Sequence, residues 1–366
     1  GEGVLFAYDH LEPRRVRDFP WAGRPCELEV VLARVACPAC QAIAVEAVEW
    51  VQPYGRQTER YERYVAGLCS LMPATDVAAL EGLDKSTVYR IDKKWLERRE
   101  ALRPERPVPR LGIDEIAIRK GHKYATVFYD LDRREVLGMV LTRKERAVSR
   151  FFRRWGKKRC RQVLAVCMDL WAPFLNSVRR HLRNAEVVFD KFHVYTYLSK
   201  AIEDVRRREQ QIAGKETGQL IKGTRWLWLK AKDRLKRKDR FTLAEIMKVN
   251  HRLQRAYLLK EDFEAFYASA DAQEAAAFLE AWTRRCRQSR LKPVIALARR
   301  LNRWAAGILA FFTHRITNGV SEGINNLIKV LKRRAYGFGD FRYFTLKILD
   351  ATGALPPLET LDYPHF

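Results

Sequence analysis

Two aspartates stand where a carboxylate needs a partner. Asp114 lies inside the apolar stretch LGIDEIAI, and Asp169 ends a second apolar stretch, VLAVCMD. A charge inside an apolar strand is costly unless a counter-charge or a metal ion compensates it. Paired carboxylates in a chain with no hydroxyl or thiol nucleophile motif suit a divalent cation such as Mg²⁺, which prefers oxygen ligands and substrate phosphates. The simpler alternative is that Asp114 or Glu115 merely faces solvent.

A third acid is expected beside such a pair, and Glu322 is the best candidate. It begins the expected helix in NGVSEGINNLIKVLKRR. Asn325 and Asn326 follow about one turn later on the same face, and cationic residues come after them. This face could place the acid at the metal ions and lead outward along a DNA backbone. The alternative is a glutamate that only interacts favourably with the helix dipole.

The stretch VVFDKFHV raises a separate question. It places His193 three residues after Asp190, which follows an apolar, strand-like run. Asp190 is therefore a candidate active-site acid, a candidate metal ligand together with His193, or a polar strand end that is satisfied locally.

Cys37 and Cys40 form a Cys-x-x-Cys pair in RVACPAC, after strand-like residues. A tetrahedral zinc site needs four ligands, so one pair supplies only half of it. Cys26 and His10 could complete the site at irregular spacing, or a second pair could precede Gly1. The alternative is a half-site without zinc, so bound Zn²⁺ is one of two readings of this pair.

The composition favours a polyanionic partner. The 366 residues include 69 Lys and Arg against 44 Asp and Glu, a formal net charge of +25. Basic runs such as FFRRWGKKRCR and VLKRR indicate an extended phosphate-binding surface. No window approaches the roughly 18 apolar residues of a membrane span, and no secretory signal is visible. We expect a cytoplasmic, nucleoid-associated protein with no membrane partner, whose cysteines are reduced or bound to metal.

Helical patterns run from about residue 58 to residue 100. Val77 and Ala78 precede a turn at Gly82, and Asp84 can cap the next helix, which is helix-turn-helix spacing. The second helix has a polar face suited to a DNA groove. From this helix and from the basic end of the Glu322 helix we expect DNA contacts by Lys85, Ser86, Thr87, Tyr89, Arg90, Lys329, Lys332, Arg333 and Arg334.

The Pro-rich segment 103–110 is typical of a linker. After it, strand and helix patterns follow in the order β-β-β-α-β-α-β, and residues from 195 to about 312 are helical in composition. Short polar connections join the first three strands, whereas helices join the later ones, so the pattern predicts a mixed, helix-flanked sheet. In such an order the strand that ends at Asp169 lies beside the strand of Asp114.

These motifs resemble the DDE transposases of bacterial insertion sequences, specifically those of the ISL3 family. The resemblance rests on YDHLEPRRVRDF, RVACPAC, GIDEIAIRKGHKYATVFYDLD, VCMDLWAPF, FDKFHV and SEGINNLIKVLKRRAYGFGDFRYF, which cover most of the chain in the expected order. It implies an α/β fold with a ribonuclease-H-like catalytic domain, whose mixed sheet follows the order β-β-β-α-β-α-β-α and carries a large all-helical insertion. A small zinc-ribbon-like module and a helix-turn-helix would precede that domain.

The domains expected on this basis follow the chain in order. They are a zinc-ribbon-like module at 1–55, a helix-turn-helix at 56–102, a linker at 103–110, the first part of the catalytic domain at 111–194, a helical insertion at 195–312, and the second catalytic part at 313–366.

The resemblance also implies roles for single residues. Asp114 matches the first acid and Glu322 the last. In the ribonuclease-H-like fold the middle acid ends the fourth strand, which selects Asp169 over Asp190. His193 would then hydrogen-bond Asp190 or contact the DNA backbone. The supporting residues are Asp190, His193, Asn325 and Asn326.

The implied function is transposition that depends on Mg²⁺, with Mn²⁺ as a substitute. The protein would bind the terminal inverted repeats of its element, hydrolyse a phosphodiester to free a 3′-hydroxyl, and join that hydroxyl to target DNA. Its partners would be double-stranded DNA and at least one further copy of the chain, because two DNA ends must be brought together. The alternatives are a nuclease of the same fold that does not join strands, and a catalytically inactive DNA-binding regulator.

Overall fold

The computed structural model describes residues 6–38, 40–119 and 123–361. Its chain forms two compact units. The terminal unit combines Gly1–Glu105 with Asn326–Phe366, and the central unit is Arg106–Asn325. Within the described residues, no helix is both long enough and apolar enough to cross a bilayer.

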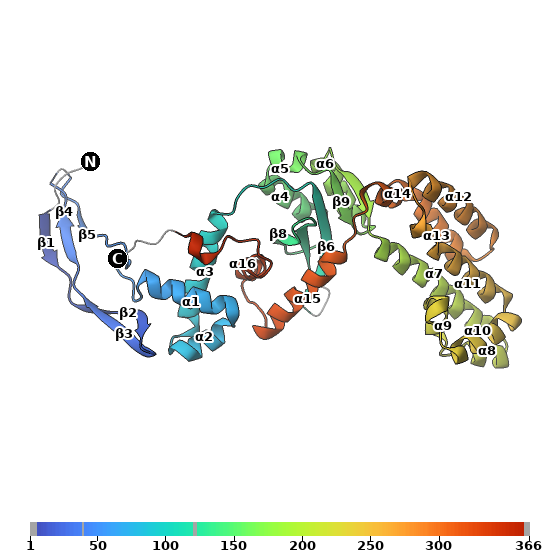
Figure 1. Ribbon diagram of the computed structural model, residues 1–366, viewed down its shortest axis with the longest axis horizontal. Helices are drawn as coiled ribbons and strands as arrows, with labels where there is room; N and C mark the ends of the chain where they lie inside the picture. Colours follow the sequence, from blue (N-terminus) through green and yellow to red (C-terminus); the bar gives the residue numbers. More distant parts are fainter. Residues whose placement is uncertain (1–5, 39, 120–122, 362–366) are drawn as a thin grey trace. The chain divides into compact units, whose positions relative to one another are not determined.

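A five-stranded mixed sheet underlies the central unit (Figure 1). Its strands are β6 (Arg110–Arg119), β7 (Lys123–Asp130), β8 (Glu135–Val140), β9 (Ala165–Met168) and β10 (Glu186–Phe189), in the spatial order β10-β9-β6-β7-β8. Strands β6, β9 and β10 are parallel, whereas β7 is antiparallel to β6 and β8. Every residue of β9 is buried, as in strands that are covered on both faces. The mixed α/β class predicted from the sequence is confirmed.

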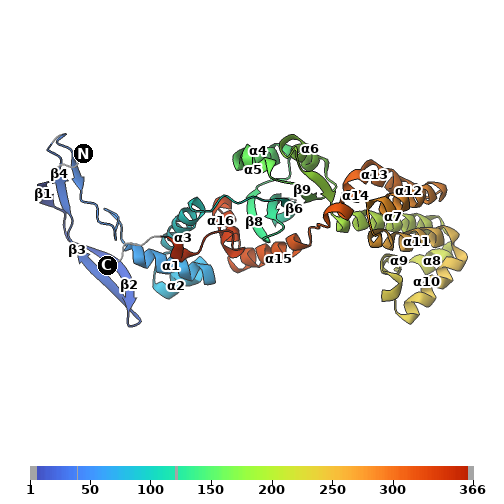
Figure 2. The same cartoon turned by 45° about the horizontal axis from the view of Figure 1, so that its top comes forward.

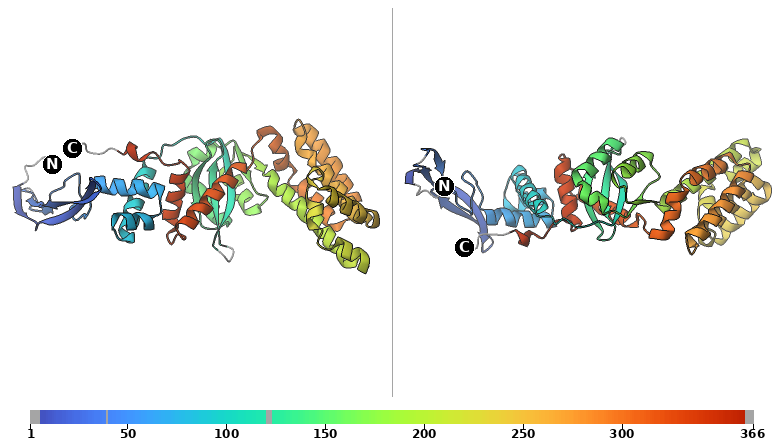
Figure 3. Two further views of the ribbon diagram at one scale, coloured as in Figure 1. Left: turned by 60° about the horizontal axis from the view of Figure 1, so that its bottom comes forward. Right: turned by 90° about the horizontal axis from the view of Figure 1, so that it is seen from above.

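Helices cover one face of this sheet (Figures 2 and 3). They are α4 (Glu145–Trp155), α5 (Lys157–Arg161) and α6 (Ala172–His181). The rings of Phe128 on β7 and Phe151 on α4 stack with their centroids 3.6 Å apart. Gly138 on β8 leaves room for this stack, because a Cβ there would lie 3.0 Å from the ring of Phe151.

From β10 the chain enters a bundle of helices (Figure 2). Its elements are α7 (Lys191–Ile212), α8 (Lys215–Ile221), α9 (Arg225–Leu229), α10 (Arg237–Val249), α11 (His251–Glu264), α12 (Ala272–Gln288), α13 (Lys292–Arg303) and α14 (Ala305–His314), with 3₁₀ turns at Lys232–Arg234 and Phe266–Ala268. Phe263, Phe266 and Trp282 are fully buried and pack ring against ring in its core. Helix α14 returns to pack on β10, so the bundle is anchored at the edge of the sheet.

The terminal unit joins the two ends of the chain. Its elements are β1 (Phe6–His10), β2 (Arg14–Trp21), β3 (Arg24–Val30), β4 (Ala33–Ala36), β5 (Ile43–Val45), α1 (Glu59–Leu71), α2 (Ala74–Glu81), α3 (Lys85–Ala101), α16 (Phe341–Ala351) and a 3₁₀ turn at Leu358–Thr360. Strands β1, β4 and β5 form one small sheet, and β2 pairs with β3 in another. The boundary between the two units falls inside α15 (Gly319–Arg334).

Buried polar contacts hold α16 against α3 and α1. Asp92 on α3 is 2% exposed and accepts hydrogen bonds from the Tyr343 hydroxyl at 2.5 Å and from Lys347, whose Nζ lies 3.1 Å away. Burial raises the pKa of Asp92, although Lys347 and Tyr343 oppose that shift. Arg99 pairs with Asp350 at 2.7 Å. Removing one partner of such a buried pair leaves an uncompensated charge, so α16 is an integral part of this unit.

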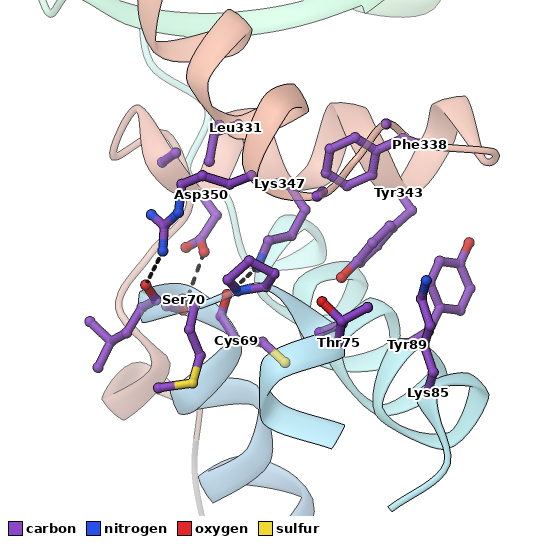
Figure 4. Close-up of a pocket in the computed structure, with 18 of the residues that line it drawn as sticks. Cys69, Ser70, Thr75, Lys85, Tyr89, Leu331, Phe338, Tyr343, Lys347 and Asp350 are labelled. Carbon is purple, nitrogen blue, oxygen red and sulfur yellow. Dashed lines mark hydrogen bonds between the residues drawn. The ribbon is translucent and has the colours of Figure 1, made fainter. Parts of the chain in front are cut away.

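Figure 4 shows further contacts of α16 with α1. The Lys347 ammonium donates to the carbonyl oxygen of Cys69 at 2.6 Å, and the Ser70 hydroxyl donates to Asp350 at 3.3 Å. These residues line a cavity of about 200 Å³ between α1, α3 and α16.

Asp340, the N-cap residue of α16, links this helix to α3 by an ion pair and a hydrogen bond. Its carboxylate accepts the backbone N–H groups of Arg342 and Tyr343. It also accepts hydrogen bonds from Lys93 at 2.7 Å and from the Tyr89 hydroxyl at 2.6 Å. These two side chains hold the pKa of Asp340 below its usual value.

We predict that Asp340→Asn lowers the free energy of unfolding at pH 7 by about 0.5–1 kcal/mol, because the amide can still cap the helix but loses the ion pair. A lowered pKa stabilises the fold above the ordinary Asp value of 3.8, and this stabilisation is lost as pH falls. The difference between Asp340→Asn and wild type should therefore shrink towards pH 3 in urea denaturation.

The matched control is Asp271→Asn at the N-cap of α12, because Asp271 caps its helix without a cationic partner among the described ion pairs. A pH-independent loss for Asp340→Asn, or an equal loss for Asp271→Asn, would contradict this role of the charge.

Candidate active site

The register of three parallel strands brings three aspartates to one edge of the sheet. Ile113 of β6 pairs with Met168 of β9, so Asp114 and Asp169 follow at the same level. Phe189 of β10 also pairs with Met168, and the N–H of Asp190 donates to the Met168 carbonyl at 3.0 Å. The carboxyl ends of parallel strands are the usual place for ligand sites in α/β sheets.

Asp114, Asp169 and His193 form the candidate centre. Each offers a ligand atom, and these atoms lie within 4.8 Å of one another. Among the residues that the structure describes, no other set of three His, Cys, Asp or Glu side chains meets this condition. All three side chains are half-buried, so they remain reachable for a ligand.

The surroundings of Asp114 disfavour its charged form. Burial, followed by the neighbouring charge of Asp169, raises the pKa of Asp114 to about 6. Its oxygens accept hydrogen bonds from the N–H of Glu115 at 2.7 Å and from Nδ2 of Asn325 at 2.9 Å. Burial and mutual repulsion both disfavour two charged carboxylates that lie close together. A cation bound between them is therefore stabilising.

His193 contacts Asp169, which is not the partner expected from the sequence. It lies in the first turn of α7, and its Nε2 atom is 2.7 Å from Oδ1 of Asp169. Burial favours the neutral imidazole, but the Asp169 carboxylate outweighs burial and raises the pKa of His193. The two acids thus shift this imidazole toward its protonated form, so ligation of a cation by His193 requires the loss of that proton.

One carboxylate oxygen at this centre is available as a metal ligand. Oδ1 of Asp169 is buried and, despite the nearby His193, has no well-aligned hydrogen-bond donor among the described residues. The donor set of two carboxylates and one imidazole suits a divalent cation, and hard oxygen ligands favour Mg²⁺ or Mn²⁺ over softer metals. The residues at this edge of the sheet thus fit a divalent cation.

Asp190 is buried and supports the structure around the site. It is 3% exposed, precedes the first residue of α7 and accepts the N–H of Asn318 on Oδ1 at 3.3 Å. Burial raises its pKa, which the N–H of Asn318 opposes. Asp190 does not belong to the described set within ligand distance. It connects the end of β10 with the segment that leads into α15.

That segment is fastened to β6. The side chain of Asn318 donates to the carbonyl of Ile113 at 3.1 Å, and buried Ser321 donates to the Asn318 carbonyl at 2.5 Å. Asn325 donates to Asp114 and accepts from the Tyr129 hydroxyl at 2.8 Å. The first turns of α15 are thereby held beside the two aspartates.

Glu322 lies on these first turns and is exposed. It precedes Asn325 by three residues, so the two side chains project from neighbouring positions of the helix surface. Its carboxylate is outside the described set within ligand distance. Asn326 is exposed and belongs to the terminal unit. Asp114 and Asp169 are thus brought together, whereas Glu322 lies on the adjoining helix.

The expected DNA-contacting residues differ in exposure. Lys85, Ser86 and Arg90 on α3 are exposed, whereas Thr87 and Tyr89 are half-buried. The Tyr89 hydroxyl donates to Asp340, so it is already engaged within the terminal unit.

On α15 the cationic residues are also not equivalent. Lys329 and Arg333 are exposed, Lys332 is half-buried, and Arg334 donates to the carbonyl of Leu71 at 2.9 Å.

Cys37 directly follows β4. The N–H of Cys37 donates to the Ala42 carbonyl at 3.0 Å, and the N–H of Gln41 donates to the Cys37 carbonyl at 2.8 Å. Neither Cys37 nor Cys40 belongs to a group of three metal-ligating side chains within the described residues. Zinc at this pair stays a prediction.

Sequence reasoning missed Asn318, Ser321 and Tyr129. Asn318 and Tyr129 bond to partners far away in the sequence, whereas Ser321 bonds to Asn318, three residues before it. Each of the three could be read as a loop or strand residue. The only local signal was that Asn318 and Ser321 stand in the polar lead-in before the expected helix.

Comparisons with known proteins agree along most of the chain. A family model described as "Transposase" matches residues 111–348, and one described as "Helix-turn-helix domain of transposase family ISL3" matches residues 46–96. The transposase for insertion sequence element IS1001 of Bordetella parapertussis is 32% identical over 339 residues, which are 92% of this chain and 83% of that protein. The transposase for insertion sequence element IS1557 of Mycobacterium tuberculosis is 27% identical over 349 residues, covering 89% of this chain and 78% of that protein.

We predict that millimolar Mg²⁺ or Mn²⁺ raises the Tm of the full chain by a few degrees at pH 8, because a ligand that binds only the folded state stabilises it. Ligation needs the deprotonated carboxylates, so this rise should fall as pH drops through about 6, the pKa of Asp114. Asp169→Asn should abolish the rise.

Asp132→Asn is the control, since Asp132 is a carboxylate of the β7–β8 connection that pairs with Arg110. It should keep the full rise in Tm. Wild-type protein whose Tm responds to neither cation would contradict the metal site.

Proposed function

Because the chain belongs to transposase family ISL3 and is a DNA transposase with a DNA-binding helix-turn-helix, we propose that Asp114, Asp169 and Glu322 are the catalytic acids of its DDE reaction. The single observation that carries this proposal is the approach of Asp114 to Asp169 at the ends of paired parallel strands. Glu322 is the third acid because Asn325, one turn further along α15, is bonded to Asp114.

The central unit is proposed to have the ribonuclease-H-like fold. Two observations support it: the strand order β10-β9-β6-β7-β8, with β7 as the antiparallel strand, and the helical bundle inserted between β10 and α15. In this scheme β9 is the fourth strand in the chain order of the sheet. Its end carries Asp169, which supports Asp169 as the middle acid.

The proposed reaction hydrolyses a phosphodiester at each end of the element and joins the freed 3′-hydroxyl to target DNA. Asp114, Asp169 and Glu322 would hold the divalent cations. When bound, such ions stabilise the charge that develops on the attacking and leaving oxygens.

The other residues of the site orient the acids. Asn325 fixes one oxygen of Asp114, and the Tyr129 hydroxyl fixes Asn325 in turn. Nε2 of His193 lies 2.7 Å from Asp169, and in its protonated form this imidazole would offset part of the charge of that carboxylate before a cation binds. Asp190 positions the Asn318 segment and thereby α15.

The helix-turn-helix would read the terminal inverted repeats through the exposed residues of α3, chiefly Lys85, Ser86 and Arg90. Its αL turn at Gly82 separates α2 from α3 as this motif requires. Two ends must be held at once, so the active complex is proposed to contain at least two copies of the chain. The zinc module at residues 1–55 and the boundaries of the other domains belong to the same proposal.

We predict that Asp169→Asn lowers both cleavage and joining of DNA that carries the element's ends by at least about a thousandfold, because the two-ion arrangement loses a ligand. DNA binding should persist. Asp190→Asn should lower the same rates by only about tenfold, since an amide oxygen can still accept the N–H of Asn318. Gel assays of cleaved and joined products, with binding measured in parallel, provide the readout.

The choice of Asp169 as the middle acid is wrong if the Asp190→Asn protein is folded and binds DNA but cannot cleave it, while the Asp169→Asn protein remains active. Cleavage without any joined product in the wild type would instead indicate a nuclease.

A further inference from the structure

A groove lies between two helices of the bundle, at a distance from the carboxylates. It has a volume of about 340 Å³ and is lined by both polar and apolar side chains of α7 and α13. The apolar ones, which form its floor between the charged residues, are Ala201, Pro293, Ala296 and Leu297. We name it the α7–α13 groove after its lining residues Tyr197, Lys200, Asp204, Arg208, Lys292 and Arg300.

The helical period places the lining residues of α7 in one row. Lys200, Asp204 and Arg208 are each four residues apart, which keeps them on the same face. The opposite face of α7 buries Leu198, Ile202 and Val205 in the bundle core. The row is therefore the face that the core leaves uncovered.

The groove has an excess of positive charge. Lys200, Arg208, Lys292 and Arg300 face one carboxylate, that of Asp204. Some other cations of this bundle are paired, as Arg206 and Arg207 both are with Glu203. By contrast, the described ion pairs within 4.0 Å include none of the groove cations. Four clustered cations that share a single carboxylate repel one another, so an anionic ligand is stabilising here.

One wall of the groove is ordered by an aromatic ring. The guanidinium of Arg300 lies 4.4 Å from the centroid of the Tyr197 ring. This cation–π contact holds a cation of α13 over α7 in the absence of any anion. The planar donors of an arginine held in this way suit a phosphate group.

Helix α7 connects the groove with the candidate active site. It begins beside Asp190, and His193 in its first turn contacts Asp169. With a rise of 1.5 Å per residue, Lys200 lies about 10 Å and Arg208 about 22 Å further along the helix than His193. The roughly 12 Å between Lys200 and Arg208 correspond to about three phosphates along one strand of B-DNA.

We propose that the α7–α13 groove binds the sugar-phosphate backbone of the DNA strand that extends away from the carboxylates. This inference rests on the proposed function, because the acids define where the strand begins. The continuity of α7 from the acids to the groove favours DNA over an acidic peptide, which has no reason to start at the catalytic edge.

The test uses the full chain with Lys200, Arg208 and Lys292 changed together to Ala. The probe is a fluorescent duplex of about 30 base pairs of mixed sequence, titrated at several salt concentrations. Each lost phosphate contact lowers the slope of log affinity against log salt by about 0.9, so the slope should fall by about 2 to 3. Affinity near 0.1 M salt should fall by about tenfold or more.

The matched control changes Lys215, Lys222 and Arg287 to Ala. These residues are exposed on the same bundle, carry the same total charge and do not line the groove. Affinity and slope should stay within about twofold of wild type. A second variant, Lys200→Arg with Arg208→Lys and Lys292→Arg, should retain the slope, which separates charge from folding. Equal losses in the groove and control variants, or no loss in the groove variant, overturn the proposal.

Two further measurements identify the ligand class and separate the groove from the catalytic acids. If the groove variant loses binding to polyglutamate but not to the duplex, the groove accepts acidic peptides and the proposal is wrong. If wild-type protein fails to cleave or join DNA while the groove variant still loses its salt slope, the proposed function fails and the groove stands. If wild-type protein cleaves and joins but the slopes are equal, only the groove fails.

Discussion

The parallel pairing of Met168 with both Ile113 and Phe189 determines what can lie at the edge of the sheet. A shift of one residue in either pair would send the following carboxylate to the opposite face. Because β9 is buried along its whole length, the hydrophobic core enforces this register. The packing that stabilises the sheet therefore also holds Asp114 and Asp169 close enough for their carboxylates to repel each other.

The repulsion is balanced by neutral donors and by one histidine. Asn325 and the N–H of Glu115 bind Asp114 without cancelling its charge, whereas His193 brings a titratable proton to Asp169. The helix that carries Glu322 is held through amide side chains, which do not compete electrostatically for a cation. These hydrogen bonds hold the acids in fixed positions but leave most of their negative charge available to a cation.

Much of this could be predicted from the sequence. Strand periodicity, together with one acid inside an apolar run and one at the end of another, was sufficient to place Asp114 beside Asp169. The partner of His193 was not predictable, because it depends on α7 starting at Lys191, directly after Asp190. A continued strand would have carried His193 about 10 Å beyond Asp190 and onto the opposite face of the sheet. The contacts of Asn318 with Ile113 and of Arg99 with Asp350 join residues far apart in sequence, and single amides or charges carry no periodic signal.

The docking of α16 on α3 has a consequence for the order of synthesis. Asp92 leaves the ribosome 251 residues before its partner Tyr343, and Arg99 likewise waits for Asp350. Until α16 is made, Asp92 and Arg99 of the helix-turn-helix lack these partners, and the core beside α3 is open on that side. A chain whose synthesis stops before α16 would therefore lack the contacts that complete this unit.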